Sequence, residues 1–140
     1  MTKNTLATEQ IKSFASGGRP TRVLIVENDS PVREGLARAL TLERFEVTTA
    51  ANGWEVLQRQ IDRSQTDALL LDLDVPDQYR WNAVRRLSAA NPLLSVIGIT
   101  GRPVHNTLAD AADLTAVLEK PFFEVPALLR LLGEAQLAGA

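Results

Sequence analysis

The sequence predicts a doubly wound α/β domain, in which a parallel β-sheet carries helices on both faces. Short aliphatic runs alternate with longer stretches of helical spacing, and the alternation occurs five times along the chain. Three of the aliphatic runs are apolar at consecutive positions, as strands covered on both faces require. At 140 residues, of which 45% are hydrophobic, the chain is long enough for one such domain and too short for two.

The candidate strands are the five aliphatic runs. In order they are Val23–Val26, Phe45–Thr48, Ala68–Leu71, Val96–Ile99 and Ala116–Leu118. The second run alternates partly between polar and apolar residues, which is typical of an edge strand, whereas the first, third and fourth are uniformly apolar. Among doubly wound folds of this size the flavodoxin-like strand order 2-1-3-4-5 is usual, and ligands bind at the carboxyl ends of strands 1 and 3.

The helices are predicted from the residues that open them and from their apolar stripes. Ser30 and Pro31 are suited to the N-cap and first position of the helix after the first strand. Asn52 followed by Gly53 opens the next helix. Further helices are expected at about Val104–Ala112 and, from the leucines after residue 128, near the end of the chain.

Residues 1–20 are expected to form an N-terminal extension that ends in a linker rich in glycine and proline, and the domain is expected to span residues 21–140. The chain has no cysteine, which excludes disulfides and thiolate sites. Its net charge of -2 gives no basis for direct nucleic-acid binding. The first residues include no apolar segment that could serve as a secretory signal or membrane span, so we expect a cytoplasmic protein.

Polar side chains follow the carboxyl ends of four of the candidate strands. Along the chain they are Glu27, Asn28, Asp29, Asp72, Thr100 and Lys120. Since parallel strands end at one edge of the sheet, these residues should converge although they span nearly a hundred positions of sequence. Their types fit phosphorylation of a carboxylate, because a divalent cation bound by oxygen ligands, an ammonium and a hydroxyl could together stabilise the phosphoryl oxygens.

Four blocks of the sequence resemble the signature segments of response-regulator receiver domains (CheY-like) of two-component signal transduction. These blocks are Val23–Asp29, Asp67–Pro76, Val96–Gly101 and Leu118–Phe122, and the likeness runs from about residue 21 to 136. Single blocks are weak evidence, but four in order at family-like spacing are strong.

The resemblance implies that Asp72 is the phosphoacceptor, taking its phosphoryl group from a histidine kinase or a histidine phosphotransfer protein. It implies Mg²⁺ held by Glu27, Asn28, Asp72 and the backbone carbonyl of Asp74. Thr100 and Lys120 match the signal-transmitting hydroxyl and the phosphate-binding lysine of the family. Phosphorylation would then switch the interaction with an output partner or domain, and whether the chain forms a homodimer stays open.

Three features depart from the family pattern. Asn28 stands where a second carboxylate is usual, so weaker Mg²⁺ binding is expected. Val117 replaces the usual aromatic residue, so the coupled switch of a hydroxyl and an aromatic ring cannot operate in its usual form. The loop after Pro76 is bulkier than usual, and Trp81 either lies beside the site, presents a partner surface, or packs beneath its own helix.

These departures make one alternative serious, namely a degenerate receiver that docks a partner without being phosphorylated. The intact Asp72, Thr100 and Lys120 favour phosphorylation. A haloacid-dehalogenase-type phosphatase would place the motif around Asp72 on the first strand, and a flavin-binding module would need a phosphate loop in place of Glu27 and its neighbours. We therefore expect a phosphoryl acceptor and not an enzyme.

Overall fold

The computed structural model describes residues 20–59, 66–101, 114–119, 129–130 and 132–133. The strands in these ranges are β1 (Arg22–Val26), β2 (Glu46–Ala50), β3 (Ala68–Asp72), β4 (Ser95–Thr100) and β5 (Ala116–Glu119). The helices are α2 (Ser30–Leu42), α3 (Gly53–Gln58) and α4 (Arg80–Ala90). Residues 129–130 and 132–133 are also helical. Each predicted strand is present, with ends within two residues of those predicted.

The five strands form one sheet, in which all pairs are parallel and the order is β2-β1-β3-β4-β5. This confirms the flavodoxin-like order expected from the sequence. All five residues of β3 are buried, whereas exposed and half-buried residues alternate along the edge strand β2 until its last residue. The central position of β3 explains why its sequence is apolar at four consecutive positions.

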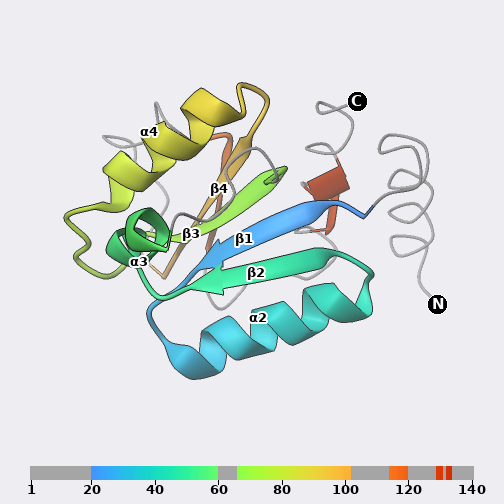
Figure 1. Cartoon of the computed structure of the whole chain (residues 1–140). Helices are drawn as coiled ribbons and strands as arrows, with labels where there is room; N and C mark the ends of the chain where they lie inside the picture. The colour runs from blue at the N-terminus through green and yellow to red at the C-terminus, as the bar shows by residue number, and fades with distance from the viewer. Residues whose placement is uncertain (1–19, 60–65, 102–113, 120–128, 131, 134–140) are drawn as a thin grey trace.

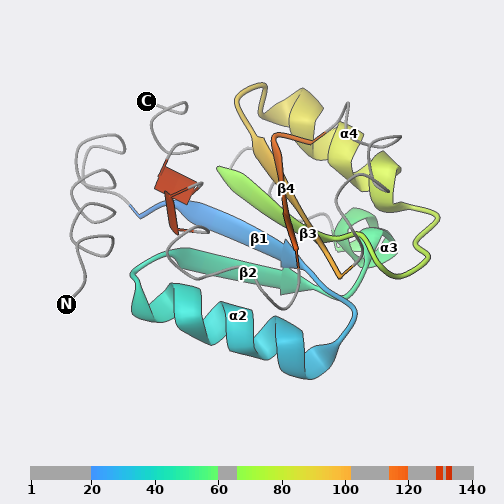
Figure 2. The same cartoon turned by 180° about the vertical axis from the view of Figure 1, so that it is seen from behind.

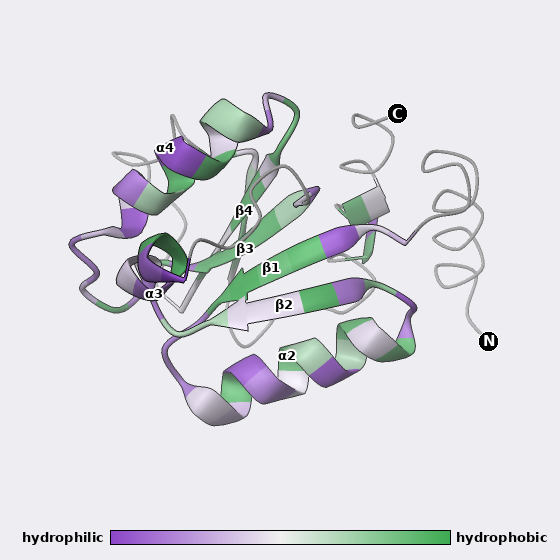
Figure 3. Cartoon of the chain, in the orientation of Figure 1, coloured by the Kyte–Doolittle hydropathy of each residue, from purple (hydrophilic) through white to green (hydrophobic). Residues whose placement is uncertain are grey.

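Helices lie on both faces of the sheet: α2 covers one face, and α3 and α4 cover the other (Figures 1 and 2). The core beneath α2 contains Val23, Ile25 and Leu70, together with Leu129 and Leu132 of the C-terminal helical residues. The core beneath α3 and α4 is built from the alternate residues of the same strands and from one face of α4. Figure 3 shows β1 and β3 as hydrophobic over most of their length. Complete burial stabilises each leucine by about 1.5–3 kcal/mol relative to exposure.

The helix starts are correct for α3 and shifted by one residue for α2. Asn52 caps α3, and its Oδ1 accepts a hydrogen bond from the Glu55 amide at 2.8 Å. The prediction that Ser30 caps α2 is wrong, because Asp29 is the N-cap and Ser30 is the first helical residue. Both residue types are good caps, and Pro31 fits either the first or the second helical position, so the local sequence does not separate the two registers.

Several predicted segments lie outside the described residues, including the N-terminal extension up to residue 19 and the helix expected at Val104–Ala112. Near the C-terminus, Leu129 and Leu132 are helical and buried, as their apolar stripe predicted. No helix in the described part of the chain is long and apolar enough to cross a bilayer.

Candidate functional site

The sheet register brings three predicted site residues to one edge. Val26 pairs with Leu71, and Asp72 pairs with Ile99. Glu27 follows Val26 in sequence and is therefore level with Asp72, while Thr100 lies one position beyond Asp72 on the neighbouring strand. All three are buried, with exposed fractions of 2% for Glu27, 6% for Asp72 and 0% for Thr100. Two carboxylates and a hydroxyl thus lie below the surface at the carboxyl edge of the sheet.

The two residues that follow Asp72 in the chain hold it in place through their backbone amides. The Leu73 amide donates to the Ile99 carbonyl at 2.9 Å, which continues the β3–β4 ladder past the end of β3. The Asp74 amide turns back and donates to Asp72 Oδ1 at 2.9 Å. This backbone donor fixes the orientation of the carboxylate, whose oxygen would act as the nucleophile.

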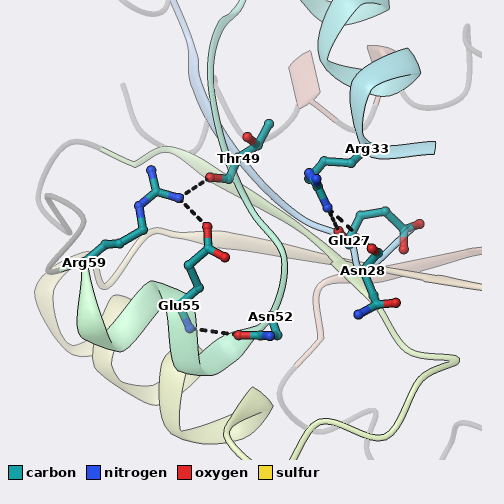
Figure 4. A network of polar contacts seen from close by, with 7 residues as sticks. All are labelled: Glu27, Asn28, Arg33, Thr49, Asn52, Glu55 and Arg59. Carbon is teal, nitrogen blue, oxygen red and sulfur yellow. Dashed lines mark hydrogen bonds and ion pairs between the residues drawn. The ribbon is translucent and has the colours of Figure 1, made fainter. Parts of the chain in front are cut away.

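The segment after β1 is held by a different set of contacts. The Glu27 amide donates to the Ala50 carbonyl at 3.1 Å, and Glu27 Oε2 accepts from the Asp29 amide at 3.3 Å. Arg33 of α2 donates through Nη1 to the backbone carbonyl oxygens of Glu27 and Asn28, at 2.9 and 3.4 Å (Figure 4). The guanidinium therefore fixes the path of the main chain at this point.

Asn28 differs from Glu27 in its exposure. Its side chain is exposed, and Figure 4 shows it pointing away from the Glu27 carboxylate. Asp29 is also exposed, and its Oδ1 accepts the Val32 amide at 3.1 Å as the cap of α2. Of the three residues after β1, only Glu27 thus contributes a buried carboxylate to the edge.

Asp74 has a role that the sequence did not reveal, since only its backbone carbonyl was expected to take part. Its Oδ1 accepts a hydrogen bond from Thr100 Oγ1 at 2.6 Å, and its Oδ2 accepts from the Gly101 amide at 2.7 Å. The carboxylate of Asp74 therefore joins the loop after β3 to the end of β4. The only signal in the sequence was an acid two residues after Asp72, at the same edge.

The loop between β3 and α4 is fastened to α3 by contacts that the sequence did not predict. Asp77 Oδ2 accepts the Gly53 amide at 2.8 Å, and its Oδ1 accepts the Tyr79 amide at 3.2 Å. The rings of Tyr79 and Trp54 lie with their centroids 4.9 Å apart, and the Arg80 guanidinium donates to the Val75 carbonyl. The loop that carries Asp74 is thus fixed at its far end against the start of α3.

Of Lys120 and Val117, the structure describes only Val117. Lys120 lies outside the described residues. Val117 is on β5, opposite Gly98 in the register, and is half-buried against the core beneath α4. Trp81 is half-buried and packs against the same core, which confirms that it packs beneath its own helix.

The donor set at this edge can be compared with what a metal ion requires. Among the described residues there is no group of three or more acidic, histidine or cysteine side chains that could enclose a metal ion. Glu27 and Asp72 are two buried carboxylates at adjacent strand ends, with the Asn28 amide nearby in sequence. Such a set of oxygen ligands fits Mg²⁺, which binds through one or two carboxylates and keeps several of its waters.

Comparison with known proteins identifies the family of the chain. Residues 23–132 match the family described as the response regulator receiver domain, which is most of the chain. The chain belongs to this family. Its parallel sheet and strand order are the fold of CheY-like receiver domains, and receiver domains are signalling domains of two-component response regulators.

Curated relatives and solved structures extend the match beyond the family signature. The receiver domain is 35% identical over 126 residues to the transcriptional regulatory protein PrrA of Mycobacterium tuberculosis, covering 84% of this chain and 54% of PrrA. It is 31% identical over 112 residues to a protein-glutamate methylesterase/protein-glutamine glutaminase of Anaeromyxobacter dehalogenans, covering 78% and 33% of the two chains. A CheY-like receiver domain protein of Methanospirillum hungatei has a TM-score of 0.68 at 24% identity, over 84% of this chain and 94% of that chain. The chain thus spans about half or less of these two curated relatives, and the likeness to the solved structure shows the fold.

Proposed function

We propose that this receiver domain accepts a phosphoryl group on Asp72 in a Mg²⁺-dependent reaction and thereby switches its interaction with an output partner or domain. The donor would be a histidine kinase or a histidine phosphotransfer protein. The observation that carries the proposal is the level placement of the buried Glu27 and Asp72 carboxylates at adjacent strand ends. Two acids buried side by side repel each other, and a bound cation would relieve that repulsion during the reaction.

In the proposed reaction an oxygen of the Asp72 carboxylate attacks the phosphorus of the donor. The bond from phosphorus to the donor nitrogen breaks, and a mixed anhydride forms on Asp72. The Asp74 amide, which donates to Asp72 Oδ1, holds the carboxylate in place during the attack. Thr100 would supply a hydroxyl donor and Lys120 a compact positive charge to the phosphoryl oxygens.

Mg²⁺, when bound, would supply positive charge that reduces the repulsion between the carboxylate and the phosphoryl group. The residues proposed to hold it are Glu27, Asn28, Asp72 and the backbone carbonyl of Asp74. Because Asn28 provides a neutral amide oxygen, the chain should bind Mg²⁺ more weakly than one with a carboxylate at this position. The exposed Asp29 is engaged as the cap of α2 through one of its oxygens and is not needed in this set.

The remaining parts of the proposal concern the setting of the domain. We place the receiver domain at residues 21–140 and treat residues 1–20 as an extension. A cytoplasmic location fits contact with a kinase, and the net charge of -2 argues against direct binding of nucleic acid. The chain itself would take the group and release it by hydrolysis without turning over a separate substrate, so simple phosphate esters should not be consumed in the presence of Mg²⁺.

The test is mass spectrometry after incubation with acetyl phosphate at a series of Mg²⁺ concentrations. The wild type should gain one phosphoryl group in a Mg²⁺-dependent manner. Asp72→Asn, which keeps the size of the side chain but lacks the nucleophilic oxygen, should gain none. Absence of an adduct in the wild type at high Mg²⁺ would instead support the degenerate receiver, which docks a partner without phosphorylation.

A further inference from the structure

Two hydrogen-bond donors at the end of β4 are occupied by an anion of the protein itself. Thr100 Oγ1 lies 2.6 Å from Asp74 Oδ1, and the Gly101 amide lies 2.7 Å from Asp74 Oδ2. An ionised carboxylate can only accept hydrogen bonds, so the single hydroxyl hydrogen of Thr100 is directed at Asp74. Both bonds are short and have a charged acceptor, which places them among the stronger hydrogen bonds in proteins.

The same residue also reaches the phosphoacceptor. The Asp74 amide donates to Asp72 Oδ1 at 2.9 Å, while the Asp74 side chain holds Thr100 and Gly101. One residue therefore spans the gap between the Asp72 carboxylate and the donors at the end of β4. A second anion attached to Asp72 would come within reach of the same donors.

Packing around Gly101 shows how close this contact is. A Cβ atom built on Gly101 would lie 3.3 Å from Asp74 Oδ2, tighter than ordinary van der Waals contact. Thr100 is fully buried, so its hydroxyl cannot exchange Asp74 for bulk water without a local movement. When the Asp74 carboxylate leaves, the buried Thr100 hydroxyl therefore needs a replacement acceptor, whereas the amide of the exposed Gly101 can also bond to water.

We propose that the Asp74 carboxylate is a built-in competitor of the phosphoryl group for the Thr100 hydroxyl and the Gly101 amide. This inference rests on the proposed function, since it needs an anion on Asp72. In the unmodified chain Asp74 holds these donors, and the phosphoryl group must displace it to gain them. Asp74 is thus a positioning residue, and its displacement releases the link between the loop after β3 and the end of β4.

The loop between β3 and α4, which contains Asp74, leads to the start of α3, where a movement of Asp74 would reach the protein surface. Its far end is held at Gly53 through Asp77, and Tyr79 packs on Trp54, whose side chain is 49% exposed. Movement of Asp74 would therefore be transmitted along a loop that is fixed at the start of α3. This route does not require the aromatic residue that Val117 replaces.

The contact can be tested first without any phosphoryl analogue. In the Asp74→Ala variant the Gly101 amide loses its charged acceptor, so its proton resonance in NMR spectra should move upfield and its exchange with solvent should quicken. Asp74→Asn keeps the size of the side chain without the charge and should shift the resonance in the same direction. An unchanged Gly101 resonance in both variants would overturn the inference.

Competition is tested with beryllofluoride, an analogue of the phosphoryl group, added with saturating Mg²⁺ and followed by ¹⁹F NMR of the bound species. Asp74→Ala should bind beryllofluoride about tenfold more tightly than the wild type, because the donors are no longer occupied. Glu34→Gln removes an exposed negative charge from α2 and should leave the affinity unchanged. Asp72→Asn should bind none.

Thr100→Val separates competition from simple charge repulsion. In this background the hydroxyl donor is absent, so Asp74→Ala should improve binding by at most about threefold, through Gly101 alone. An equal gain with and without the hydroxyl would show that only the charge of Asp74 matters and would overturn the inference. Equal binding by wild type and Asp74→Ala would overturn this inference alone, whereas no binding by any variant would overturn the proposed function and the inference together.

Discussion

Replacing Gly53 by alanine should destabilise the domain, although alanine is the better helix former. A Cβ atom at residue 53 would lie 2.6 Å from the Tyr79 carbonyl oxygen, 2.7 Å from the Tyr79 carbonyl carbon and 2.9 Å from the Arg80 amide nitrogen. To reach a contact of 3.4 Å, the two backbones would have to separate by about 0.8 Å, which is 3.4 minus 2.6. All three neighbouring atoms belong to the backbone, so no flexible side chain can move aside.

The magnitude follows from two opposed terms. Alanine in place of glycine favours a helix by up to about 1 kcal/mol. Packing the new Cβ atom against the backbone of Tyr79 and Arg80 costs about 1–3 kcal/mol. Weakening the hydrogen bond from the Gly53 amide to the Asp77 carboxylate costs a further ~1.5 kcal/mol or more. We therefore expect Gly53→Ala to lower the free energy of unfolding by about 2 kcal/mol.

Gly35→Ala is the matched control, because a Cβ atom there meets nothing within 4 Å and Gly35 lies in the interior of α2. It should raise the free energy of unfolding by about 0.5–1 kcal/mol. Urea unfolding followed by circular dichroism measures both variants against the wild type. Gly53→Ala as stable as the wild type would refute the argument that the loop after β3 is fixed against the start of α3.

Three further predictions concern the core, the cap and the metal ligands. Leu70→Ala should lower the free energy of unfolding by about 2–5 kcal/mol, because Leu70 is fully buried on β3. Leu42→Ala, at a residue 77% exposed, should change it by less than about 0.5 kcal/mol. Urea unfolding measures both variants, and equal losses would contradict the difference in burial. Asp29→Ala should cost about 1 kcal/mol through loss of the cap of α2, and Asp29→Asn much less; similar losses in both would contradict the capping role. Asn28→Asp should tighten Mg²⁺ binding several-fold, measured by titration of Trp fluorescence, and an unchanged dissociation constant would contradict the proposed ligand role of residue 28.

The sheet could be predicted because its signal is local and repeated. Uniformly apolar runs such as Ala68–Leu71 indicate strands covered on both faces, and right-handed crossovers leave few orders for five of them. The convergence of Glu27, Asp72 and Thr100 then followed from the parallel arrangement alone. These inferences need only the pattern of residue types and not the positions of side chains.

The contacts between loops could not be predicted in the same way. The bond from Thr100 to Asp74 spans 26 positions, and the one from Gly53 to Asp77 spans 24. Each depends on the path of a loop, which residue types do not determine. The one-residue error at the cap of α2 has a similar cause. Asp29 and Ser30 are both suitable N-cap residues, and the choice between them depends on the backbone conformation between the end of β1 and the start of α2.

The way Arg33 holds the turn after β1 makes residue 28 free to vary. The guanidinium binds the carbonyl oxygens of Glu27 and Asn28, which every amino acid possesses, and the exposed Asn28 side chain forms no part of that contact. A substitution at this position can therefore change the local charge without rebuilding the turn. Single substitutions of residue 28 can therefore change the charge and the metal-binding groups beside the carboxyl ends of β1 and β3 with little change in the free energy of unfolding.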